Sequence, residues 1–299
     1  MPAELDYSVV DVFTSSALQG NPLAVVLDTA GLTSDRMQAI AREFNLSETT
    51  FIQRRPAVVE QSEGIRVRIF TTQEELPFAG HPTLGTASVL KTLAPDAIKD
   101  NTVALALSVG RVPVRFEDRP GTAAIFGEMT QRDPEFGPEL DPAEVARMAG
   151  LERGDLDPAL PPQVVSTGTA FAIVALRSLD ALDRMQVNHG KATPWLRERG
   201  ARWFYVLAPT GSREPAFRTR MQFYGGEDPA TGSAAGCAIS YLVAREAVAS
   251  GQRILVRQGV EIGRPSDLFL SAKSISGRLT DVRVAGSTIL VAKGQLFLP

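Results

Sequence analysis

The sequence predicts a mixed α/β (α+β) protein built from two similar halves. Two short patterns each occur twice, in the same order and at nearly the same spacing, and apolar runs typical of strands alternate with segments typical of helices. A repeat of this length in two copies indicates a duplicated domain with pseudo-twofold symmetry, because the repeats of solenoid proteins are much shorter.

The first repeated pattern is a tetrapeptide that follows an apolar run. Asp35-Arg-Met-Gln38 recurs as Asp183-Arg-Met-Gln186. At the same spacing the run 23–26 matches the run 171–174, and a glycine precedes each run. We expect both tetrapeptides to lie in helices that follow these strands.

The second repeated pattern is E-x-P-x-x-G, which occurs as Glu75-Leu-Pro-Phe-Ala-Gly80 and as Glu227-Asp-Pro-Ala-Thr-Gly232. The two glutamates occupy equivalent places, so we expect them to share a structural role, bonding backbone N–H groups of the turn. Asp228 stands where the first copy has Leu76, which is where a difference in function could enter a symmetric scaffold.

The two halves are predicted as residues 1–130, to which the C-terminal strand could return, and residues 131–299. The segment 132–142, rich in proline and acidic residues, is the predicted linker. In the first half we predict a helix over 35–44 and strands at 7–13, 23–27, 49–53, 65–70, 103–108 and 123–126. In the second half we predict a helix over 233–246 and strands at 163–166, 171–176, 203–207 and 218–223, with further strands in the tail.

The composition is that of an ordinary folded protein, with 44% hydrophobic and 22% charged residues. A net charge of −3 without long basic runs argues against nucleic acid as a partner. The start of the chain does not resemble a signal peptide, and no uncharged apolar run reaches membrane-spanning length, so we expect a cytoplasmic protein. A single cysteine and two histidines exclude an intrachain disulfide and make a Cys/His metal site improbable.

Both copies of E-x-P-x-x-G lead into helices of small, apolar residues, 82–90 and 234–242, which must be buried on all sides. Gly80 and Gly232 precede them and would let a ligand approach the positive N-terminal ends, which suits a small carboxylate. The alternative is that these residues are plain helix caps. His81 could likewise be a structural histidine, and Cys237 is predicted to pack inertly.

Several ordered motifs resemble the PhzF family of phenazine-biosynthesis proteins, and together they cover nearly the whole chain. The resemblance implies a diaminopimelate-epimerase-like fold, in which each half wraps a curved sheet around a central helix and the active site lies between the halves. It also implies a homodimer and an isomerase that needs no cofactor or metal. The family's reference activity is the isomerisation of trans-2,3-dihydro-3-hydroxyanthranilate. The motifs are Asp11-Val-Phe-Thr14, Gly20-Asn-Pro22, Asn45-Leu-Ser-Glu-Thr-Thr-Phe51, Glu75-Leu-Pro-Phe-Ala-Gly-His-Pro82, Glu227-Asp-Pro-Ala-Thr-Gly-Ser233 and Gln258-Gly-Val-Glu-Ile-Gly-Arg-Pro-Ser266.

The resemblance carries the family's catalytic residues onto Glu48, His81 and Asp228. One carboxylate can remove a proton from one carbon and return it to another, and burial of Glu48 against Phe51 or similar walls would raise the pKa of Glu48 toward neutrality. The alternative reading of Glu48 is a solvent-facing residue at the start of a strand. Related racemases use two cysteines in the paired glycine turns, whereas this chain has Ala79 and Thr231 there, so a two-thiol racemase is excluded.

Substrate binding is expected from Ser233 and Asn21, and from the backbone N–H groups at Gly80 and Gly232. The expected partner is therefore a small-molecule carboxylate. A protein of another class, which binds a small ligand or a partner on the same scaffold without catalysis, is the alternative.

Overall fold

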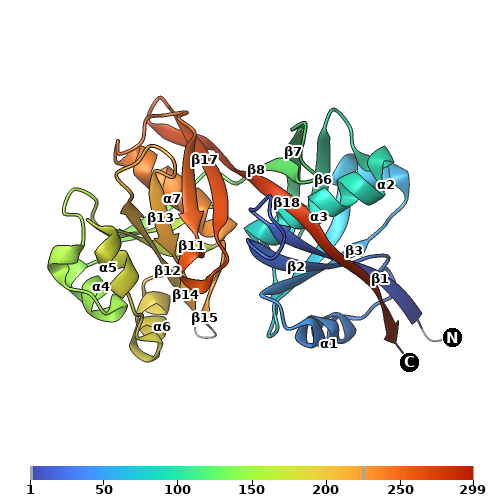
Figure 1. Cartoon of the computed structure of the whole chain (residues 1–299), viewed down its shortest axis with the longest axis horizontal. Coiled ribbons are helices and arrows are strands. Elements are labelled where there is room, and N and C mark those ends of the chain that lie inside the picture. The colour runs from blue at the N-terminus through green and yellow to red at the C-terminus, as the bar shows by residue number, and fades with distance from the viewer. Residues whose placement is uncertain (1–2, 224–225, 299) are drawn as a thin grey trace. The chain divides into compact units, whose positions relative to one another are not determined.

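The computed structural model describes residues 3–223 and 226–298, and the chain divides into two compact units (Figure 1). The first unit combines Met1–Thr130 with Ala285–Pro299, and the second unit is Gln131–Val284. The second unit is thus shorter than the predicted half 131–299, because the end of the C-terminal strand returns to the first unit.

The first unit is a sheet that closes around one central helix. Its helices are α1 (Ser34–Phe44), α2 (Ala57–Glu63), α3 (Gly80–Leu93) and the short 3-10 helix η1 (Pro95–Ala97). Its strands are β1 (Ala3–Val12), β2 (Asn21–Val26), β3 (Glu48–Gln53), β4 (Ile65–Phe70), β5 (Glu75–Leu76), β6 (Thr102–Leu107), β7 (Gly110–Glu117), β8 (Ile125–Thr130) and the last part of β18 (Arg278–Leu298). Neighbouring strands follow the order β1-β2-β3-β4-β6-β7-β8-β18, and β18 also pairs with β1, so the sheet surrounds α3.

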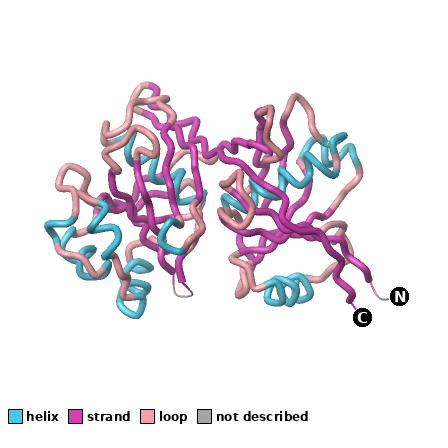
Figure 2. Tube along the Cα trace, viewed as in Figure 1, coloured by secondary structure: helices cyan, strands magenta, loops and turns pink. Residues whose placement is uncertain are grey.

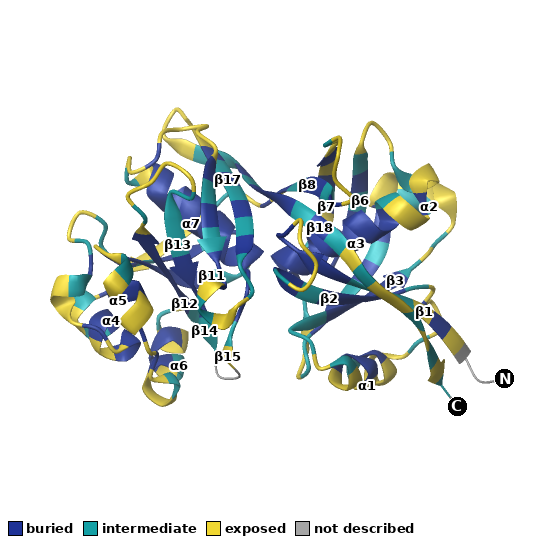
Figure 3. Ribbon diagram, in the orientation of Figure 1, coloured by how far each residue is buried: buried dark blue, intermediate teal, exposed yellow. Residues whose placement is uncertain are grey.

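Helix α3 is buried along most of its length, as its small and uncharged residues predict (Figure 3). Every residue from Gly80 to Leu90 is buried. A Cβ atom on Gly85 would stand 2.6 Å from Cδ2 of Leu23 and 2.8 Å from Cγ2 of Val12, so glycine is what allows the strands to approach the helix. Helix α1 packs on the opposite face of the sheet, in a core that includes Met37 and Phe51.

The second unit repeats this plan around another central helix. Its helices are α4 (Pro142–Ala149), α5 (Leu179–Arg184), α6 (His189–Glu198) and α7 (Gly232–Ala244), with the 3-10 helices η2 (Arg153–Asp155) and η3 (Val260–Ile262). Its strands are β9 (Glu135–Glu139), β10 (Gln163–Ser166), β11 (Ala170–Ala175), β12 (Trp203–Pro209), β13 (Phe217–Arg220), β14 (Gln222–Phe223), β15 (Gly226–Glu227), β16 (Ile254–Gln258) and β17 (Ser266–Ile275). Neighbouring strands follow the order β17-β16-β13-β12-β11-β10-β9, and β14 pairs separately with β15.

The two faces of this second sheet carry different helices (Figure 2). Helix α7 contacts β10, β11 and β17, and its residues from Gly232 to Val243 are all buried. Helices α4, α5 and α6 pack with the alternate residues of β10, β11 and β12 in a separate apolar core that includes Val174, Leu182, Trp195 and Phe204.

Most predicted elements lie at the predicted residues, and β4 and β10 have the predicted bounds. The predicted strand 218–223 is interrupted at Met221, which separates β13 from β14. The predicted linker 132–142 is partly wrong, because Glu135–Glu139 forms the strand β9 and pairs with β10. Those residues therefore belong to the second sheet.

The second tetrapeptide does not lie within a helix, so that prediction is wrong. Asp35 lies in the first turn of α1, but in the second copy Ser178 caps α5 almost directly after β11, and this short helix ends at Arg184. Met185 has an extended backbone, and the N–H of Gln186 donates to the carbonyl of Ala149. The strands of the two copies correspond, whereas the tetrapeptides do not.

Candidate active site

The first unit brings Asn21, Glu48 and His81 together. Asn21 begins β2 and Glu48 begins the neighbouring parallel strand β3, while His81 is the second residue of α3. Nδ1 of His81 lies 3.2 Å from Nδ2 of Asn21, and its Nε2 lies 3.5 Å from Oε2 of Glu48. The order of elements thus places a carboxyl group beside an imidazole at the N-terminal end of the central helix.

His81 is electrically neutral at physiological pH. Its residue is 3% exposed, and burial lowers its pKa to about 3, although a backbone hydrogen bond with Pro22 acts in the opposite direction. A neutral imidazole has one donor and one acceptor nitrogen. His81 is therefore an uncharged neighbour of Glu48, and the contact at 3.5 Å is not an ion pair.

Glu48 lies on the α3 face of the sheet, and its side chain is 16% exposed. Side chains alternate along a strand, so Glu48 shares its face with Thr50, whose hydroxyl lies 2.8 Å from that of Thr86 in α3. Phe51 points to the other face, into the core beneath α1. The prediction that Phe51 forms a wall beside Glu48 is therefore wrong.

The N-terminal end of α3 is suited to receive an anion. Its N-cap residue is Ala79, whose methyl group cannot accept a hydrogen bond, and Pro82 at the third position has no N–H group. The first turn of an α-helix leaves its N–H groups without intrahelical acceptors and carries partial positive charge. Gly80 and His81 supply these N–H groups.

The second unit holds Asp228, Gly232 and Ser233 around the start of α7. Asp228 and Ser233 are each 8% exposed, and Gly232 and Ser233 are the first two residues of the helix. Oδ2 of Asp228 accepts a hydrogen bond of 2.6 Å from the hydroxyl of Thr231. Gln258 donates to the Asp228 carbonyl over 2.8 Å.

A buried glutamine, Gln131, holds the first turn of α7 in place. Nε2 of Gln131 donates to the carbonyl of Gly232 over 2.9 Å, and Oε1 of Gln131 accepts from the hydroxyl of Thr167 over 2.6 Å. A Cβ atom on Gly236 would stand 2.0 Å from Oε1 of Gln131. A glycine in α7 therefore makes room for the residue that fixes the start of the helix.

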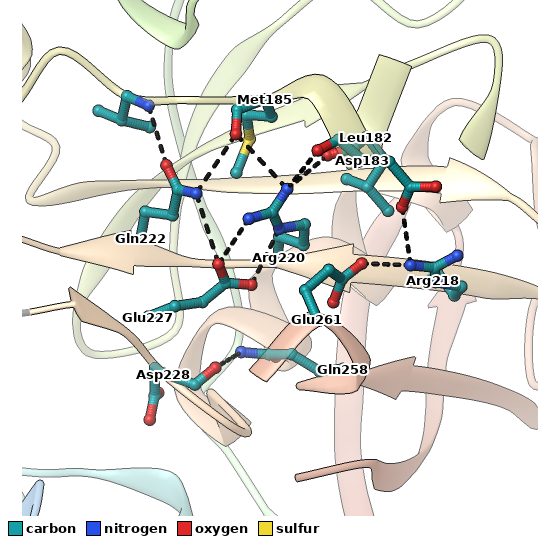
Figure 4. Close-up of polar contacts among 11 residues, drawn as sticks. Leu182, Asp183, Met185, Arg218, Arg220, Gln222, Glu227, Asp228, Gln258 and Glu261 are labelled. Atoms are coloured by element: carbon teal, nitrogen blue, oxygen red, sulfur yellow. Dashed lines mark hydrogen bonds and ion pairs between the residues drawn. The ribbon is translucent and has the colours of Figure 1, made fainter. Parts of the chain in front are cut away.

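The repeated glutamates share a role, but their partners are arginines and not the expected backbone N–H groups. Glu227 receives hydrogen bonds of 2.9 and 2.7 Å from Arg220, which raise the pKa of that arginine (Figure 4). Glu75 receives bonds of 2.8 and 2.5 Å from Arg68. In each unit the pair joins a sheet strand to the turn that leads into the central helix.

Cys237 is fully buried in α7, and burial raises its pKa to about 11. It has no thiolate character near neutral pH, in agreement with its predicted packing role. Among the residues that the structure describes, no three or more histidine, cysteine or acidic side chains are grouped so that they could hold a metal ion. Within the same residues, no helix is long and apolar enough to cross a membrane.

Four polar residues near the site were not predicted as site residues from the sequence: Arg220, Thr231, Gln131 and Gln258. Thr231 lies inside the repeated E-x-P-x-x-G pattern and Gln258 begins the last motif, so sequence patterns mark the positions of both residues. Arg220 could have been found by aligning the two copies, because Arg68 occupies the same place before Glu75. For Gln131 we find no signal in the sequence.

The chain is similar over its full length to known isomerases. A family model described as PhzC-PhzF, phenazine biosynthesis-like protein, matches residues 10–294. A trans-2,3-dihydro-3-hydroxyanthranilate isomerase of Pseudomonas aeruginosa is 37% identical over 98% of this chain and 99% of that protein. An uncharacterized isomerase of Mesorhizobium japonicum is 35% identical with the same coverage.

Solved structures confirm the predicted fold class. The crystal structure of a PhzF-family phenazine biosynthesis protein from Bacillus anthracis is 26% identical, with a TM-score of 0.86 over 99% of this chain and 100% of that chain. A hydroxyproline epimerase from Agrobacterium vitis is 12% identical, with a TM-score of 0.64 over 99% of this chain and 93% of that chain. The second likeness concerns the fold alone, which is diaminopimelate-epimerase-like.

Proposed function

The chain belongs to the PhzC-PhzF family and is an isomerase, and we propose that it moves a proton within a small carboxylate substrate, with Glu48 as the transferring group. The observation that carries this proposal is the position of Glu48, partly buried and 3.5 Å from the neutral ring of His81.

A single carboxylate is sufficient for this reaction. Glu48 removes a proton from an sp³ carbon of the substrate, and the electron pair of the broken C–H bond forms a new C=C bond. The electron pair of the adjacent C=C bond shifts to a second carbon, which receives the proton back from the Glu48 carboxyl group. Atoms and electrons balance within the substrate, so the reaction consumes no oxidant, reductant or cofactor.

His81 assists this transfer as a neutral group. A ring whose pKa is lowered to about 3 is not a permanent cation, so it does not form an ion pair with the Glu48 carboxylate. It donates or accepts one hydrogen bond toward Glu48 or toward the substrate, and Asn21 holds the far nitrogen of the ring. Two functions follow for His81: orientation of Glu48 and relay of a proton to a polar group of the substrate.

In the second unit, the start of α7 is proposed to bind the substrate carboxylate through Ser233 and the N–H group of Gly232. The helix has no side-chain cap of its own, so its first N–H groups remain suited to an anionic ligand. Asp228 is an acceptor for a substrate hydroxyl or ammonium group. We propose that these residues serve the same reaction as Glu48 and His81.

The first substrate to test is trans-2,3-dihydro-3-hydroxyanthranilate, which the relative from Pseudomonas aeruginosa isomerises according to its name. The experiment follows solvent deuterium incorporation, by mass spectrometry, into this compound and a panel of amino-acid-like and dihydroaromatic acids. Binding without exchange for every compound would favour the non-catalytic alternative over an isomerase.

The variant that tests the base is Glu48→Gln, which keeps the shape of the side chain and removes its basicity. We expect exchange to fall by about 10²- to 10⁴-fold, the usual contribution of a general base. Glu63→Gln is a suitable control, because that side chain is 60% exposed and should leave exchange unchanged. Exchange by Glu48→Gln close to that of the wild type would overturn the proposal.

The homodimer and the cytoplasmic location stay predictions.

A further inference from the structure

The carboxylate of Asp228 is held by a hydroxyl group that is itself held by a buried amide. Gln258, the last residue of β16, is 0% exposed. Its Nε2 donates to the carbonyl of Asp228 over 2.8 Å, as Figure 4 shows, and to Oγ1 of Thr231 over 3.0 Å. Its Oε1 accepts from the backbone N–H of Thr231 over 3.1 Å.

These bonds fix the direction of the Thr231 hydroxyl. Because Oγ1 of Thr231 accepts from Gln258, its own hydrogen is left to donate, and Oδ2 of Asp228 lies 2.6 Å away. Hydrogen bonds from a hydroxyl to a carboxylate are short and strong. One oxygen of Asp228 is therefore held in place, which orients the whole carboxylate.

The same arrangement keeps the start of α7 uncapped. Thr231 is the N-cap residue, where a threonine hydroxyl ordinarily accepts a hydrogen bond from an N–H group of the first turn. In this helix no side-chain cap bond forms, and the hydroxyl oxygen accepts from Nε2 of Gln258 instead. The Thr231 hydroxyl therefore occupies none of the first N–H groups of α7.

Gln258 is rigidly placed for this task. Its backbone pairs with Thr219 in the sheet, and a Cβ atom on Gly259 would stand 2.7 Å from the carbonyl oxygen of Pro229. The strand end and the turn from Asp228 to Thr231 therefore pack against each other through backbone atoms. A side chain anchored in this way moves little on its own.

We propose that Gln258 and Thr231 are positioning residues of the isomerase: Gln258 orients the Thr231 hydroxyl, and this hydroxyl holds the Asp228 carboxylate toward the substrate. The inference rests on the proposed function, in which Asp228 contacts the substrate. It adds two residues that act through Asp228 and touch no reacting atom.

The test compares Thr231→Val with Thr231→Ser on the panel compound that the wild type exchanges fastest. Valine keeps the shape and removes the hydroxyl, so we expect kcat to fall by about 10- to 100-fold with KM within about threefold of the wild type. Serine keeps the hydroxyl and should hold kcat within about threefold. If Thr231→Val does not fold, Thr231→Ala takes its place.

Thr29→Val is the matched control. Thr29 is 0% exposed, against 7% for Thr231, and its hydroxyl donates to the carbonyl of Ile52 over 2.9 Å in the first unit. This variant loses a comparable buried hydrogen bond and should lose stability without a change in kcat. An equal loss of kcat in Thr29→Val and Thr231→Val would mean that general destabilisation explains both.

Gln258→Met tests the second link. If Gln258 acts through Thr231, the double variant Thr231→Val/Gln258→Met should have a kcat within about threefold of the worse single variant, whereas independent effects would multiply. Multiplying effects, or a Thr231→Val enzyme as fast as the wild type, would overturn the inference. The proposed function has a separate test: it would be overturned if Glu48→Gln kept the activity of the wild type.

Discussion

The repeated arginine–glutamate pairs predict that one substitution has unequal costs in the two units. Glu227→Gln removes a charge from a pair whose side chains are 9% and 7% exposed. Arg220 also donates over 2.8 Å to the carbonyl of Leu182 and over 3.1 Å to that of Asp183, so it cannot swing into solvent without breaking these bonds. A guanidinium group does not deprotonate, and the buried charge would remain unpaired.

The expected cost of Glu227→Gln is about 3 kcal/mol in the free energy of unfolding. Removing one partner of a buried pair typically costs about 3–5 kcal/mol. The lower end applies here because glutamine keeps one acceptor for Arg220. Glu75→Gln is the matched control, since the side chains of Arg68 and Glu75 are 15% and 33% exposed, and solvent screening should keep its cost below about 1 kcal/mol.

Urea unfolding combined with hydrogen exchange and mass spectrometry measures both costs. Two compact units need not unfold in one step. The urea unfolding curve of the whole chain is therefore complemented by the protection from hydrogen exchange of peptides from 217–223 and from 66–70. We expect lower protection in the first peptide for Glu227→Gln and little change in the second for Glu75→Gln. The reasoning would be refuted by equal losses in the two variants, or by a greater loss in Glu75→Gln.

Three further predictions concern buried groups. Because the pKa of His81 is lowered to about 3, the unfolded chain takes up the proton first as the pH falls below about 6.5, and the free energy of unfolding should decrease by up to about 1.4 kcal/mol per pH unit. His81→Gln should remove this part of the slope in urea unfolding between pH 7 and 5, and equal slopes would contradict the assignment. Gly85→Ala should cost about 1–3 kcal/mol by overpacking, while Gly31→Ala, where a Cβ meets nothing within 4 Å, should be nearly neutral; a more stable Gly85→Ala would show that helix propensity dominates. Cys237 should resist a thiol reagent at pH 8 in the folded protein and react after unfolding in urea, and fast labelling of the folded protein would disprove its burial.

The two-unit plan could be predicted from the sequence because it is expressed in local patterns. A duplicated turn and the two uncharged segments 82–90 and 234–242 need no knowledge of distant contacts, and the burial of these parts of α3 and α7 follows from their composition. The grouping of Glu48 with His81 came from the family resemblance alone. No spacing in the chain indicates that the start of β3 lies beside the start of α3.

The errors have identifiable physical causes. Phe51 lies three positions after Glu48 in one strand, so alternation alone would have placed them on opposite faces. The contact between Gln258 and the turn at Asp228 depends on β16 pairing with β13, a long-range choice that no local pattern expresses. Sequence reasoning therefore found the turn but not the residues that hold it.

Comparison of the two turns shows which part of the duplicated design stayed the same and which part diverged. An arginine in the preceding strand binds the glutamate in both units, so the attachment of the turn to its sheet is common to the two copies. The residues next to this attachment differ, with Leu76 against Asp228 and Ala79 against Thr231. The second copy thus carries a carboxylate and a hydroxyl where the first has apolar groups, and the first carries Glu48 and His81 at other positions. A duplicated scaffold with a shared attachment can therefore acquire different chemistry in each half, because substitutions beside the ion pair leave the turn itself in place.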